Sequence, residues 1–154
     1  MRSCDLHALA IQDRVFLRGP HRDPEYAARR EGLFLVAVNC GRSASTCFCV
    51  SMNTGPAVTD GADLVLTERP EGFVVRVGSE AGRELLAKLA VCECTPAELA
   101  EAEEVPKRAA KQQIRSINTA TVHDTLMKNL NHTRWDEVAK RCLSCANCTM
   151  VCPT

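Results

Sequence analysis

Residues 33–41 read LFLVAVNCG, and this stretch decides the fold class of the N-terminal part of the chain. The six residues 33–38 form a continuous apolar run, which is typical of a strand that is covered on both faces. Asn39, Cys40 and Gly41 follow at once, so we predict that the strand ends in a polar loop. In α/β folds, loops that follow strand ends commonly hold the ligands.

Two helices are predicted before this run. The first covers residues 4–17, with Ser3 as its N-cap and leucines on one face. The second begins at Asp23-Pro24, because an N-cap aspartate followed by proline is typical of a helix start. Gly32 is predicted to end this second helix, immediately before the apolar run.

Two further strands and a helix are predicted after the run. The strands cover residues 62–67 and 72–77, and the turn signal Arg69-Pro70-Glu71 lies between them. The helix covers about residues 79–90. Helices combined with a few strands predict an α/β (α+β) unit built on a small mixed sheet.

The composition changes after Cys94. Residues 95–118 are rich in Ala, Glu, Lys and Gln and hold almost no large apolar side chains, so we predict a solvated connecting helix. Thr95-Pro96-Ala97-Glu98 is a capping box that begins this helix. Pro106 is predicted to break or kink it.

Two more capping boxes, at residues 121–124 and 133–136, predict further helices. Trp135, Val138 and Cys142 recur at helical spacing and predict a buried face that leads into the last cysteines. The predicted architecture is an α/β unit over residues 1–94, a helical connector over 95–141 and the start of a bacterial ferredoxin-like module, a truncated [4Fe–4S] segment, over 142–154.

The C-terminal cysteines follow the spacing C-x2-C-x2-C-x3-C-P, from Cys142 to Pro153. This is the spacing with which bacterial ferredoxins bind [4Fe–4S] clusters, and it predicts Cys142, Cys145, Cys148 and Cys152 as ligands. Two-residue gaps let the backbone wrap a cluster and turn its amides inward. Zinc is the alternative, but its sites more commonly use two separated cysteine pairs. Cys152 either closes this cluster or ligates a second one.

Four earlier thiols form a second candidate site, at Cys4, Cys40, Cys47 and Cys49. We predict that they converge around one [4Fe–4S] cluster, with sulfur–sulfur distances of about 6–7 Å. The alternative is that they are buried structural thiols, a common fate of free cysteine. Cys92 and Cys94 are predicted to lie outside this site.

Composition excludes several other classes of function. The chain has 154 residues with 19 basic and 19 acidic side chains, so it lacks the basic excess of a nucleic-acid-binding protein. Its first residues lack the apolar core of a signal peptide, and no apolar run approaches the ~20 residues of a membrane span. We therefore expect a cytoplasmic protein, in which the clustered cysteines among its ten bind metal rather than form disulfides.

Several stretches together resemble the 4Fe–4S dicluster electron-transfer subunits, namely the beta subunit of soluble sulfhydrogenases and the A subunit of anaerobic sulfite reductases. The two most specific are TCFCVSMNTGP and RCLSCANCTMVCPT. The full set is SCDLHALAIQDRVFL (3–17), DPEYAARRE (23–31), VAVNCG (36–41), TCFCVSMNTGP (46–56), DGADLVLTE (60–68), VGSEAGRELL (77–86) and HTRWDEVAKRCLSCANCTMVCPT (132–154).

The resemblance implies an oxidoreductase subunit of anaerobic metabolism that relays electrons without substrate chemistry of its own. Its implied partners are a flavin-containing NAD(P)H- or ferredoxin-linked subunit and a catalytic redox subunit. It also favours the cysteine site at Cys4, Cys40, Cys47 and Cys49. Family members continue into a second ferredoxin run and have a region before the Cys-Asp motif. We therefore expect this chain to be a central fragment of a longer subunit or the product of a truncated reading frame.

Two other functions fit parts of the pattern. A catalytic oxidoreductase would bind substrate at an open iron of the N-terminal cluster and would use His7 or Asp5 as its acid–base group. A zinc-stabilised assembly module would use the same thiols as structural ligands.

Overall fold

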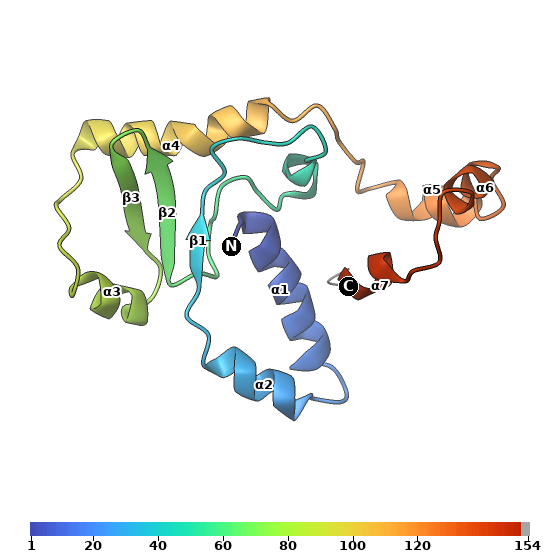
Figure 1. Cartoon of the computed structure of the whole chain (residues 1–154), viewed down its shortest axis with the longest axis horizontal. Coiled ribbons are helices and arrows are strands. Elements are labelled where there is room, and N and C mark those ends of the chain that lie inside the picture. Colours follow the sequence, from blue (N-terminus) through green and yellow to red (C-terminus); the bar gives the residue numbers. More distant parts are fainter. Residues whose placement is uncertain (152–154) are drawn as a thin grey trace.

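The computed structural model, which describes residues 1–151, contains a three-stranded mixed sheet (Figure 1). Its strands are β1 (Val36–Val38), β2 (Leu64–Arg69) and β3 (Gly72–Val77), in the order β1-β2-β3. β1 pairs with β2 in parallel, and β2 pairs with β3 antiparallel. The predicted α/β fold class with a small mixed sheet is therefore confirmed.

β1 is shorter than the apolar run that predicted it. The Asp63 carboxylate accepts the N–H of Leu35 at 2.6 Å, and the Leu35 carbonyl accepts the Asp63 N–H at 2.8 Å. These bonds hold Leu35 outside the regular ladder, while Leu33 and Phe34 are exposed. The N–H of Leu35 and the hydroxyl of Ser79 donate to the Asp63 carboxylate and lower its pKa.

The two N-terminal helices are α1 (Ser3–Phe16) and α2 (Pro24–Glu31). Asp23 caps α2 as predicted, since its side chain accepts the Tyr26 N–H at 2.9 Å, and Gly32 follows the last turn. The predicted cap of α1 is wrong: Arg2 is the N-cap, and Ser3 is buried inside the first turn. Ser3 is therefore part of the packed interior.

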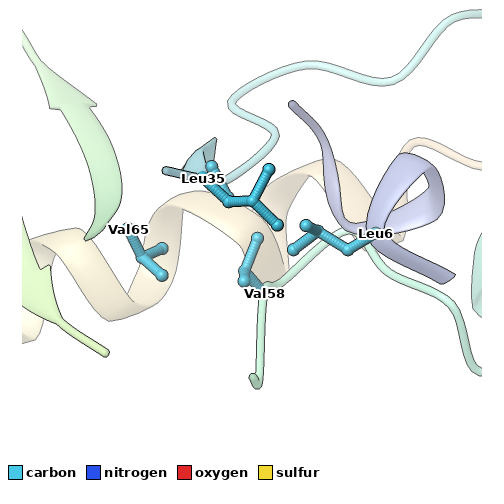
Figure 2. Packing of buried hydrophobic residues seen from close by; sticks show 5 residues of the cluster. Leu6, Leu35, Val58 and Val65 are labelled. Atoms are coloured by element: carbon cyan, nitrogen blue, oxygen red, sulfur yellow. The ribbon is translucent and has the colours of Figure 1, made fainter. Parts of the chain in front are cut away.

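The core joins α1 to the sheet. Figure 2 shows Leu6 of α1 beside Leu35 and Val58, with Val65 on the other side of these two residues, and Ala37 completes the cluster. Ala37 lies directly opposite Val65 in the ladder, so both side chains point to the same face of the sheet. Val65 is only 2% exposed, which places the densest packing at the middle strand.

α3 (Glu80–Leu86) packs on β3 and is shorter at both ends than predicted. Its N-cap is Ser79, whose hydroxyl accepts the Gly82 N–H at 3.1 Å. Gly82 is buried, and a Cβ there would overlap the carbonyl oxygen of Asp63 and lie 3.2 Å from Leu64 Cδ2. A glycine is therefore required where α3 crosses the start of β2.

Gly82→Ala is expected to destabilise the fold by about 1–3 kcal/mol, the usual effect of overpacking a filled site. Urea unfolding of the two proteins followed by circular dichroism measures the difference. Gly32→Ala is the matched control, because a Cβ at Gly32 meets nothing within 4 Å. Equal unfolding midpoints for wild type and Gly82→Ala would contradict the close approach of α3 to β2.

α4 (Pro96–Lys111) is not the solvated helix that its composition predicted. It packs on β2 and β3 through four buried residues, which are Ala102, Val105, Pro106 and Ala109. Pro106 does not end the helix, because packing on the sheet offsets the backbone hydrogen bond that proline cannot make. The small side chains of this face let the helix approach the sheet closely.

Ion pairs at the start of α4 strengthen this contact. Arg69 of β2 binds Glu98 at 3.0 Å and Glu101 at 2.7 Å. The predicted capping box at Thr95 is present. The Thr95 N–H and hydroxyl, followed by Arg69, lower the pKa of Glu98 to about 2.

The C-terminal helices are α5 (Val122–Lys128), α6 (Arg134–Ala139) and α7 (Asn147–Val151). Figure 1 shows α5 and α6 lying apart from the sheet. Neither Thr121 nor Thr133 makes the predicted side-chain cap, and the predicted buried face is wrong, since Trp135 is 43% and Val138 is 46% exposed. All of residues 118–150 are exposed. No helix in the described range 1–151 is long and apolar enough to span a bilayer.

Candidate metal centres

The C-terminal cysteine segment contains two non-glycine residues with left-handed backbone angles. Ser144 and Ala146 have φ angles of 52° and 59°, in the left-handed region that non-glycine residues rarely occupy. The Ser144 N–H points to the Cys142 thiol, with an N–Sγ distance of 3.4 Å. Cys148 follows in the first turn of α7. Inward-facing amides of this kind are the interaction that stabilises thiolates at a metal.

The three predicted ligands Cys142, Cys145 and Cys148 are all exposed. Their thiols are thus accessible to an incoming cluster or to a partner subunit. The fourth predicted ligand, Cys152, lies outside the described residues 1–151. The assignment of these four thiols stays a prediction that rests on their spacing.

Cys40 and Cys49 lie within electrostatic range of the Cys4 thiol. Partial burial raises the pKa of the Cys4 thiol, with further contributions from Asp5, Cys40 and Cys49. Cys4 is in the first turn of α1, Cys40 follows β1, and Cys49 begins the short 3-10 helix η1 (Cys49–Met52). The chain thus brings thiols separated by more than 30 residues to the same end of β1.

The loop after β1 folds back to make this convergence possible. The Cys40 N–H donates to the Pro56 carbonyl at 3.2 Å, and the Asn39 carboxamide bonds both to Thr67 and to the Val58 N–H. Gly55 has a φ of +152°, and a Cβ there would lie 3.4 Å from Cys49 Sγ and 3.2 Å from Ser3 Cβ. Gly55 therefore allows the η1 loop to approach the start of α1.

Cys47 is placed by a turn in which its N–H donates to the Ala44 carbonyl at 3.0 Å, and its thiol is half-buried. Its membership of the N-terminal site stays a prediction. Cys92 and Cys94 are exposed, and the Cys94 thiol contacts the Thr95 carbonyl at 3.6 Å. Their position at the start of α4 agrees with leaving both out of the site.

The spacing of the candidate ligand side chains decides whether they could hold a single metal ion or a [4Fe–4S] cluster. Within residues 1–151, no three Cys, His, Asp or Glu side chains are close enough to hold a single metal ion. A [4Fe–4S] cubane requires wider spacing, about 6–7 Å between thiolate sulfurs. Cys40 and Cys49 each lie within electrostatic range of the Cys4 thiol without forming a single-ion site, which agrees with that wider spacing.

Two polar residues near Cys4 were candidates for acid–base chemistry. His7 Nδ1 lies 2.9 Å from the Ser3 carbonyl oxygen, one turn earlier in α1. The Asp5 carboxylate accepts the Arg2 N–H at 2.7 Å, as part of the start of the same helix. Both side chains therefore have a structural role at the beginning of α1.

Sequence reasoning missed the residues that surround Cys49. Gln113 donates to the Cys49 thiol with an N–S distance of 3.1 Å, and it also bonds to Ser43. Gln113 is 64 residues from Cys49, in a stretch whose composition indicated only a polar linker. The Gly55-Pro56 pair predicts a turn, but this turn signal does not indicate that Gly55 approaches the Cys49 thiol.

The whole of this chain is 37% identical, over 156 aligned positions, to sulfhydrogenase 2 subunit beta of Pyrococcus furiosus. The match confirms the resemblance to the beta-subunit family of soluble sulfhydrogenases. The chain spans 46% of the length of that relative. No protein-family model matches the chain, and no solved structure matches it.

Proposed function

We propose that this chain is an iron–sulfur electron-transfer part of a sulfhydrogenase-type complex. It relays electrons between a flavin-containing NAD(P)H- or ferredoxin-linked partner and a catalytic hydrogenase or sulfite reductase subunit. The observation that carries the proposal is the C-x2-C-x2-C-x3-C-P run. Identity of 37% to a sulfhydrogenase subunit over the whole chain supports the type of complex.

In this proposal the chain holds two cysteine sites. Cys142, Cys145 and Cys148 bind the C-terminal cluster, with Cys152 either as its fourth ligand or as a ligand to another cluster. The N-terminal cluster is bound by the thiolates of Cys4, Cys40, Cys47 and Cys49. A bound [4Fe–4S] cluster supplies the site that accepts and releases one electron at a time.

The protein's contribution is to bind and to tune rather than to transform a substrate. The Ser144 N–H beside Cys142 stabilises negative charge on a ligand sulfur. At the N-terminal site the groups considered for proton transfer, His7 and Asp5, are engaged at the start of α1. This arrangement favours electron transfer over the alternative in which substrate binds at an open iron.

Anaerobic purification and reconstitution of the full chain tests the proposal. We expect broad absorption near ~400 nm and about four iron and four sulfide per occupied site, hence about eight of each with both sites filled. A chain that binds zinc stoichiometrically and shows no visible absorption would overturn the proposal in favour of an assembly module.

A further inference from the structure

The segment that follows α4 is joined by hydrogen bonds to the loop carrying Cys47 and Cys49. Its residues 112–117 lie between the sheet and the C-terminal helices. Six hydrogen bonds connect the end of α4 and this segment to the loop, and four of them are Ser43 N–H to Gln112 Oε1 (3.0 Å), Ser43 Oγ to the Ala109 carbonyl (2.8 Å), Val50 N–H to Gln113 Oε1 (3.1 Å) and Ile117 N–H to Ser51 Oγ (3.0 Å).

The Gln113 side chain contacts the cysteine itself. Its Nε2 donates to Cys49 Sγ at 3.1 Å and to Ser43 Oγ at 3.2 Å. Its Oε1 accepts the N–H of Val50, the residue next to Cys49. Because the Val50 N–H can bond only to the oxygen, it fixes the carboxamide with the nitrogen toward the sulfur. The side chain is half-buried, so these bonds are partly protected from water.

An N–H that points to a ligand sulfur affects the two redox states of a cluster unequally. Adding an electron increases the negative charge on the cluster and its thiolates, and a donor stabilises that charge. Hydrogen bonds to the sulfurs are one of the factors that set cluster potentials. A donor to Cys49 therefore favours the reduced cluster, and its removal lowers the midpoint potential.

We propose that Gln113 is a positioning residue for Cys49, which holds the ligand sulfur in place and favours the reduced state of the N-terminal cluster. The inference rests on the proposed function, because it takes Cys49 as a cluster ligand. It goes further by assigning a tuning role to the segment that leads toward the C-terminal cysteines. That segment thus connects the two cysteine sites along the chain and also contacts one of them.

Variants of Gln113 test this role in the full chain, reconstituted anaerobically with iron and sulfide. Gln113→Leu removes all the hydrogen bonds of the carboxamide. Gln113→Glu keeps an oxygen for the Val50 N–H but places an acceptor where the donor to Cys49 was. Gln112→Leu is the matched control, because the Gln112 side chain bonds to the Ser43 N–H in the same loop.

The readouts are the midpoint potential of the N-terminal cluster, from a dithionite titration followed by electron paramagnetic resonance, and the rate of iron loss to a chelator. In both Gln113 variants we expect the reduced-to-oxidised ratio at a fixed potential to fall about threefold or more. Iron release is expected to become about tenfold faster, the lower end of losses for outer-shell partners. Gln112→Leu is expected to behave like wild type.

The outcomes separate the inference from the proposed function. A wild-type chain that binds no N-terminal cluster overturns both. A wild-type cluster whose potential is unchanged in both Gln113 variants overturns only the role of Gln113. Equal shifts in Gln112→Leu and Gln113→Leu also overturn it, because they would assign the effect to loop attachment. If Gln113→Leu does not fold, Gln113→Glu decides the question, since it can keep the bond to Val50.

Discussion

Cys145→Ser is expected to abolish the C-terminal cluster and to lower the iron content by about four atoms per chain. Cys145 is the middle of three ligands that belong to this cluster whether or not Cys152 closes it. A serine hydroxyl is a far weaker iron ligand than a thiolate, so one replacement leaves the cluster incompletely held. Iron and sulfide analysis, with absorption near ~400 nm, measures the loss after identical anaerobic reconstitution.

Cys94→Ser is the matched control for this variant. It removes one thiol of the same chain. Cys94 is exposed just before α4, and its thiol contacts the Thr95 carbonyl. We expect its iron content to equal that of wild type. Wild-type iron and an unchanged spectrum in Cys145→Ser would refute the assignment of the C-terminal run.

Local signals in the sequence predicted the elements that depend on local interactions. Three such elements are present: the helix start at Asp23-Pro24, the capping box at Thr95 and the turn between β2 and β3. Each depends on residues within three or four positions along the chain, so a short window contains the information. The fold class followed from these elements together with the apolar run at residues 33–38.

Tertiary contacts decided the features that sequence reasoning missed. α4 looked solvated because its buried face is made of small residues, and only the presence of the sheet shows that Ala102 and Ala109 are covered. Similarly, β1 begins later than the apolar run, because the N–H of Leu35 bonds to the carboxylate of Asp63, 28 positions away in the sequence. Neither effect leaves a periodic pattern in the sequence.

The two candidate sites differ in the same way, since one is indicated by local sequence signals and the other depends on tertiary contacts. The C-terminal run is visible because all its predicted ligands lie within eleven residues, from Cys142 to Cys152. The N-terminal grouping depends on how α1, β1 and η1 meet, which the spacing of the thiols does not specify. Gln113 could not be predicted, because its bond to Cys49 arises from the path of the chain after α4.

Cys40→Ser is expected to remove the N-terminal cluster selectively. Cys40 follows β1, and its N–H bond to the Pro56 carbonyl does not involve the thiol, so the loop should keep its fold in the variant. The Cys40 thiol also contributes to the raised pKa of the Cys4 thiol, so these two predicted ligands lie within electrostatic range of each other. We expect about four fewer iron atoms per chain and retention of the C-terminal cluster.

The double variant Cys40→Ser/Cys145→Ser separates the two sites from each other. If each thiol serves its own cluster, the two losses add, and the double variant binds almost no iron. The alternative reading of Cys4, Cys40, Cys47 and Cys49 as structural thiols gives a different result: Cys40→Ser alone would keep wild-type iron, and urea unfolding of the metal-free protein would show lower stability instead. That combination would exclude Cys40 as a ligand and leave the chain with only its C-terminal iron–sulfur site.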